Sequence, residues 1–156
     1  MSVYGTIQFL EPVSQTTLTN SVDLGQRRIY NGAEYIYVYN NGGASITSGY
    51  GVTVSGLSGF SVTVSSVTQI NAMFGVCTEK TIATAYYGWV MTKGFAQIVM
   101  GANNSAAVGD HMHAGPDGVF AVNSVATGYI DGPCGVSVQA IASAGSGKIW
   151  FRGMFA

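Results

Sequence analysis

The chain has 156 residues, of which 47% are hydrophobic, 22 are glycine and only 8% are charged. Soluble domains carry about 25% charged residues, so this chain lacks the usual charged coat. Its abundant Tyr, Phe, Val and Ile exclude low-complexity disorder. The net charge of −1 without a basic cluster argues against a nucleic-acid partner, and no apolar stretch is long enough for a membrane-spanning helix. We expect much of the surface to lie against other protein.

The first 23 residues differ from the rest and predict an extended arm, 1–23, ahead of one β-barrel-like domain, 24–156. They are rich in Ser, Thr and Gln and show no sustained alternation. Three apolar residues, Ile7, Phe9 and Leu10, lie in a stretch with few charges. A strand-competent stretch of this kind is an aggregation hazard when left uncovered, so we expect it to pair with another subunit. The alternative is a disordered tail.

From Leu24 onwards the pattern favours β-strands. In residues 34–39, the tyrosines at 35, 37 and 39 share one face of a strand, and Ile36 and Val38 share the other. The tyrosine face indicates a cross-strand aromatic ladder or, alternatively, a surface that stacks on glycans. Residues 52–55 and 60–64 flank a Gly-containing turn and predict a hairpin. Further strands are expected at 88–91, 95–100, 119–122 and 148–151.

The fold class follows from the number and spacing of these strands. No stretch keeps a 3.6-residue apolar period over three turns, so we expect little or no helix. Many short strands separated by turn residues are typical of a small barrel or sandwich. The sequence therefore predicts an all-β fold, a small β-barrel or sandwich of short antiparallel strands with an extended N-terminal arm.

One internal correspondence suggests a quasi-duplicated barrel edge. Two series of small and apolar residues match at an offset of about 60 residues, and chance similarity in a Gly-rich chain is the alternative. The first series is Gly75-Val76, Ile82-Ala83, Ala85, Gly88, Val90 and Gly94-Phe95, and the second is Gly135-Val136, Ile141-Ala142, Ala144, Gly147, Ile149, Gly153 and Phe155.

Reactive side chains do not form a recognisable catalytic set. His111 and His113 can share one face of a strand, but zinc sites need three or four ligands, so we expect no metal and no cofactor. Cys77 and Cys134 have no C-x-x-C spacing and are predicted to be buried free thiols, with a single bridge as the alternative. No nucleophile elbow or phosphate-binding loop is present. We therefore expect no catalytic residues and no enzyme activity.

The stretch Leu24–Arg28 leading into residues 32–40, together with the two matching series, resembles the small head-decoration (cement) proteins of tailed bacteriophages. The resemblance covers roughly residues 24–156. It implies a β-barrel on the outer surface of the virion capsid that binds the major capsid protein after the head expands and stabilises contacts between its subunits. It also implies a homotrimer or another homo-oligomer, made in the host cytoplasm. An N-terminal arm would engage the shell, with Arg27 and Arg28 at its root as anchors to shell carboxylates.

Two other functions fit the same residues. The chain could be another virion β-protein, such as a head fibre base or a tail component. A glycan-binding module that uses the tyrosine face is the third hypothesis.

Overall fold

The computed structural model describes residues 12–55, 59–65, 73–122 and 134–153. Within these ranges the chain forms strands and turns, with one 3₁₀ turn at Pro116–Gly118 and no α-helix. The prediction of an all-β fold is therefore confirmed. The strands are β1 (Arg27–Tyr30), β2 (Ala33–Asn40), β3 (Tyr50–Val54), β4 (Ser61–Val64), β5 (Met73–Cys77), β6 (Tyr87–Val99), β7 (His111–Ala114), β8 (Phe120–Val122), β9 (Gly135–Ser137) and β10 (Ser146–Arg152).

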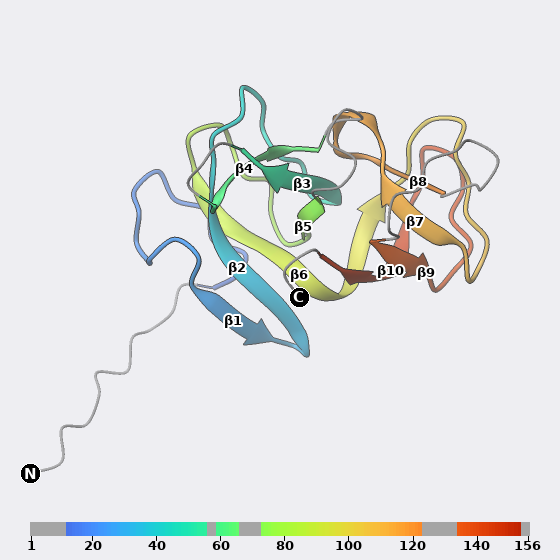
Figure 1. The fold of residues 1–156 in the computed structure, drawn as a ribbon, viewed down its shortest axis with the longest axis horizontal. Coiled ribbons are helices and arrows are strands. Elements are labelled where there is room, and N and C mark those ends of the chain that lie inside the picture. Colours follow the sequence, from blue (N-terminus) through green and yellow to red (C-terminus); the bar gives the residue numbers. More distant parts are fainter. Residues whose placement is uncertain (1–11, 56–58, 66–72, 123–133, 154–156) are drawn as a thin grey trace, which may run out of the picture.

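The first unit is a closed barrel of five strands in the order β2-β4-β3-β5-β6, closed because β6 also pairs with β2. In Figure 1 these strands, coloured from blue to yellow, surround a common interior. Neighbouring strands are antiparallel except β2 and β4, which run parallel where Tyr39 faces Ser61. The apolar faces of the strands fill the interior with Ile36, Val38, Ile46, Val52, Val62, Phe74, Cys77, Ile82 and Val90.

Strand β6 is 13 residues long and belongs to two units. Its first half pairs with β2 and its second half with β10, so in Figure 1 it passes from one lobe into the other. Between the halves, Gly94 has φ 135°, and a Cβ there would lie 2.7 Å from the Cβ of Ala33. Only glycine fits so close an approach with this backbone conformation.

The second unit repeats the plan of the first. Its strands follow in the order β6-β10-β9-β7-β8. An isolated parallel bridge joins Phe120 of β8 to Met100, the residue after β6, in the place that the parallel β2–β4 pair takes in the barrel. A reciprocal backbone pair joins Ile46 to Ile82 in the first unit, and the same pair joins Ala106 to Ile141 in the second. The internal correspondence is therefore confirmed as a structural repeat for its described members, and Phe155 lies outside the described residues.

The matching glycines have a common steric cause. A Cβ at Gly88 would lie 2.8 Å from the side chain of Ile82, and one at Gly147 would lie 2.5 Å from the side chain of Ile141. In each unit the isoleucine of the preceding Ile-Ala pair packs directly on the glycine of the next strand. The two series are alike because each unit needs the same close contact.

Strand β1 forms a hairpin with β2 that the sequence reading missed. Its two-residue turn is Asn31-Gly32, with φ of 48° and 77°. Positive φ at both positions is typical of the type I′ turn, which Asn-Gly favours. The hairpin carries Ile29 and Tyr30 out to the surface, where they are 77% and 41% exposed.

Residues 12–23, which were assigned to the arm, pack against the first unit where the structure describes them. Val13 is only 5% exposed, and Thr17 exchanges two backbone hydrogen bonds with Tyr87 at the start of β6. The hydroxyl of buried Tyr37 lies 3.1 Å from the hydroxyls of both Thr17 and Ser21. A buried tyrosine needs a partner for its hydroxyl, and this polar segment supplies two. Residues 1–11, with Ile7, Phe9 and Leu10, lie outside the described residues.

Candidate partner-binding surface

The predicted anchor residues lie on β1. Arg27 is exposed and Arg28 is partly buried, with its guanidinium 5.8 Å from the centre of the Tyr30 ring. A cation in this position is attracted to the face of the ring. Both arginines therefore lie on the surface, beside the exposed residues of the β1–β2 hairpin.

Among the described residues, an exposed aromatic pair lies on the second unit. Phe95 on β6 is 62% exposed and Trp150 on β10 is 40% exposed. The two residues face each other across the antiparallel pair, with ring centroids 4.8 Å apart and planes at 71°. Their strands alternate strictly here, because the intervening residues point into the core. The sheet thus presents an edge-to-face aromatic pair to its outside.

The same face continues across neighbouring strands. Val136 of β9 lies opposite Trp150, and exposed His111 of β7 lies opposite Val136. On the other side of the tryptophan, Gln97 pairs with Lys148, and both are exposed. Partners in an antiparallel register project to the same face. These side chains therefore form one continuous surface.

A pocket of about 250 Å³ connects this surface to the β1–β2 hairpin. Its lining includes Tyr30 of β1, Tyr35 of β2, Phe95 of β6 and Lys148 of β10. Glu79, from the loop after β5, also lines it. The Tyr35 hydroxyl donates a 2.9 Å hydrogen bond to the Glu79 carboxylate. Burial raises the pKa of Tyr35 far above its ordinary value, so the phenol stays protonated and remains the donor.

Basic groups concentrate around the same place. The chain has six Lys and Arg residues, and all but Lys80 lie on β1, β6 or β10. Lys93 is held 3.3 Å from the Glu34 carboxylate. Lys148 and Arg152 lie on the exposed side of β10. We call this surface the aromatic–basic face, made up of Tyr30, Phe95, Gln97, Lys148, Trp150 and Arg152.

Sequence reasoning predicted the strand at 148–151 but missed this face. The feature of the sequence that points to this face is the alternation of Lys148, Trp150 and Arg152 with Ile149 and Phe151, which are buried. One strand alone does not show which face is covered. The register that puts Phe95 next to Trp150 joins segments far apart in the chain.

The tyrosine row is not a binding platform, and the glycan hypothesis based on it is wrong in that form. Tyr35 is 2% exposed and Tyr37 is fully buried. Tyr37 stacks on Tyr87 and also contacts Trp89, at centroid distances of 6.0 and 5.1 Å. The rings form a ladder, as the first interpretation predicted, but it lies in the core because residues 12–26 cover it.

The two cysteines are buried as free thiols, as predicted, and they lie in separate cores. The Cys77 thiol donates to the Lys80 carbonyl at 2.9 Å, and the Cys134 thiol donates to the Met112 carbonyl at 3.2 Å. Burial raises the pKa of each thiol from 9.0 to about 12. Neutral thiols of this kind are poor nucleophiles.

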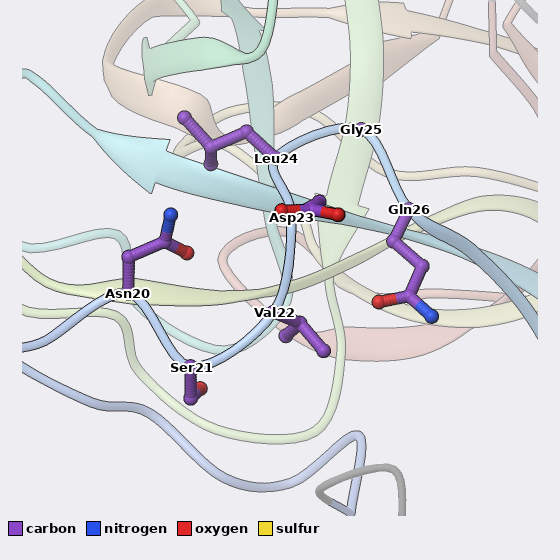
Figure 2. A pocket seen from close by; sticks show the side chains of 7 residues that line it. All are labelled: Asn20, Ser21, Val22, Asp23, Leu24, Gly25 and Gln26. Carbon is purple, nitrogen blue, oxygen red and sulfur yellow. The ribbon is translucent and has the colours of Figure 1, made fainter. Parts of the chain in front are cut away.

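No other described group of residues offers chemistry. Within the described ranges, no set of three or more His, Cys, Asp or Glu side chains could hold a metal ion. Figure 2 shows a surface hollow lined by residues 20–26, all from one loop that carries a single carboxylate, Asp23. Within the described residues, no helix is long and apolar enough to cross a membrane. The aromatic–basic face is therefore the candidate functional surface.

Comparison with known proteins bears on the fold. No known family matches the sequence, and no curated protein matches it. Among solved structures, the chain is similar to the N base of the head fiber gp8.5 of bacteriophage phi29, with a TM-score of 0.54 and 12% sequence identity. The match covers 75% of this chain and 93% of that chain. At this identity the likeness shows a shared fold.

Proposed function

We propose that this protein is a non-enzymatic structural protein of a bacteriophage virion, mounted on the outer surface of the head. The observation that carries the proposal is the shared fold, which spans 93% of the N base of a phage head fiber. A chain with only 8% charged residues and an exposed aromatic pair suits a protein that works against other protein. These features support attachment to a protein shell rather than catalysis.

In its finer form, the proposal is a decoration or cement protein. It binds the major capsid protein of the expanded head and stabilises contacts between capsid subunits, as a homotrimer or another homo-oligomer. Ile7, Phe9 and Leu10 of the N-terminal segment contact the shell, and Arg27 and Arg28 add attraction to shell carboxylates. The charge-poor composition and the resemblance of residues 24–156 to cement proteins support this form.

The second candidate is the base of a head fibre, which the likeness to a head fiber N base supports equally. A fibre base needs to bind the shell and carry a further structure, without bracing the shell itself. The two candidates therefore share an attachment surface and differ in what attachment does to the head.

Sedimentation with purified heads tests the proposal. Expanded heads lacking the protein are mixed with the purified full chain, and saturable co-sedimentation is expected. Unexpanded heads should bind at least tenfold more weakly if attachment follows expansion. Absence of binding to either form would contradict the proposed function.

Heat resistance of the decorated heads separates the two candidates. A cement protein that bridges neighbouring subunits binds the assembled shell in preference to separated subunits, so by mass action it raises the temperature at which expanded heads release DNA, in proportion to occupancy. A fibre base leaves that temperature close to that of undecorated heads at full occupancy.

A further inference from the structure

The outer faces of the two units differ in burial, although their strands correspond. The register that pairs Tyr37 with Trp89 in the first unit pairs Gln97 with Lys148 in the second. Both members of the first pair are buried, whereas both members of the second are exposed. The same strand, β6, thus changes from buried on both faces to buried on one.

The connectivity explains this difference. In the first unit, residues 12–26 precede β2, and the hydroxyls of Thr17 and Ser21 lie 3.1 Å from the Tyr37 hydroxyl on its outer face. In the second unit, the strand that corresponds to β2 is the second half of β6. The residues before it are the first half of β6, which are already part of the barrel. No equivalent covering segment precedes the second unit.

The side chains left on the uncovered face are those of a protein interface. Trp, Tyr and Arg are enriched among the residues that dominate binding energy between proteins, and Trp150, Tyr30 and Arg152 lie here. Phe95 and Trp150 meet edge to face at 71°, and Tyr30 meets Tyr35 at 65°. Because Phe95 and Trp150 lie at a steep angle to each other, and Tyr35 is buried, these rings do not form one flat platform. The shape fits an apolar depression better than a stacked sugar or base.

The charge of the face selects the kind of partner. Lys148 and Arg152 flank the aromatic pair on β10. Glu34 forms an ion pair with Lys93, and Glu79 accepts a hydrogen bond from Tyr35. The described aspartates, 23, 110 and 117, lie on other segments. A second copy that used the same face would bring like charges together, which is unfavourable. A partner with carboxylates around an apolar centre is complementary.

We propose that the aromatic–basic face is the surface by which this protein docks on the head, and that it binds a carboxylate-bordered apolar surface of the shell protein. The inference rests on the proposed function and deepens it. It places the main contact on the second unit, in addition to the N-terminal segment and the arginines of β1.

The test uses full-length variants and expanded heads that lack the protein. The double variant Phe95→Ser with Trp150→Ser should weaken binding at least tenfold, because it removes the exposed aromatic pair. Lys148→Glu should also weaken binding severalfold and make it less sensitive to salt, because it removes a cation from the contact. Each variant is first checked for an unchanged circular dichroism spectrum, and its self-association state is measured alongside head binding.

Matched controls are Leu18→Ser and Val108→Ser, which change residues that are 63% and 68% exposed but lie outside the face. Both controls should bind heads like the parent chain. If the parent binds and the double variant binds equally well, the docking surface is assigned wrongly and the proposed function stands. Loss of self-association in the double variant, with head binding per subunit retained, would overturn the inference in favour of a contact between copies. If the parent chain does not bind, both proposals fail.

Discussion

The two halves of β6 show how one strand takes on two environments. From Tyr87 to Thr92 its side chains are largely buried on both faces, because the barrel lies on one side and residues 12–26 lie on the other. From Phe95 to Val99, buried and more exposed positions alternate. The two halves have the same backbone plan and differ in what covers them. Burial in a repeat is therefore set by connectivity as well as by the strand's own residues.

The largest difference in stability between a buried and an exposed position is expected on β10. Phe151 is fully buried, and its neighbour Trp150 is 40% exposed. Phe151→Ala should lower the free energy of unfolding by about 3–5 kcal/mol through lost burial and a residual cavity. Trp150→Ala should lower it by about 1 kcal/mol or less, as for exposed positions. Urea denaturation of both variants measures the difference, and equal losses would mean that the face is covered in the free protein.

Two truncations test the covering segment of the first unit. Removal of residues 1–22 takes away buried Val13 and the hydrogen bonds of Thr17. We expect a loss of about 3.5–5 kcal/mol, from roughly 1.5–3 for the valine and about 1 for each of the two backbone hydrogen bonds. Removal of residues 1–11 alone leaves these contacts intact, so its melting temperature should stay close to that of the full chain. If the two truncations melt alike, residues 12–22 do not stabilise the barrel.

The repeated glycines provide a test that is independent of the surface. Gly88→Ala and Gly147→Ala each force a methyl group into the packed isoleucine of the same unit, and overpacking of this kind costs about 1–3 kcal/mol. The losses should be similar, because the contact is the same in both units. Gly43→Ala is the control, since nothing lies within 4 Å of a Cβ there. A large loss at only one of the two glycines would show that the units are not energetically equivalent.

The fold was largely readable from the sequence, because period-two alternation and turn residues are local signals. Residues 34–39 form the strand they predicted, and the match of Gly88 with Gly147 correctly indicated a repeat. The sequence did not show in the same way that residues 12–23 pack on the first unit. Ser and Thr normally indicate an exposed segment, and here the hydroxyls of Thr17 and Ser21 instead reach the buried hydroxyl of Tyr37.

The candidate surface was not predictable for a different reason. Phe95 and Trp150 each resemble ordinary strand residues, and they are exposed because none of the described segments covers this side of the second unit. The tyrosine row shows the opposite case, because Tyr35 and Tyr37 suggested a usable face until residues 12–26 were placed over it. A single strand specifies its two faces, and the tertiary connections decide which face is left open.

The smallest expected effect concerns a matched pair in the two cores, Cys77 and Ser137. They occupy equivalent places, since the Cys77 thiol donates to the Lys80 carbonyl and the Ser137 hydroxyl donates to the Gln139 carbonyl. Cys77→Ser should therefore keep its hydrogen bond and cost only about 1 kcal/mol near neutral pH. Cys134→Ser should likewise keep a hydrogen bond, to the Met112 carbonyl, and is expected to cost about as much.

The pH dependence sharpens this comparison. Burial raises the pKa of the Cys77 thiol from 9.0 to about 12, so the folded chain keeps a proton that the unfolded chain releases. The resulting stability is complete below pH 9 and is lost as the pH rises towards 12. Cys77→Ser removes this contribution because serine does not titrate in that range. The unfolding free energy of the parent should therefore fall more steeply between pH 9 and pH 11 than that of the variant, as measured by urea denaturation at each pH. Parallel curves would mean that the thiol is solvated in the folded protein, and that Cys77 is not a counterpart of buried Ser137.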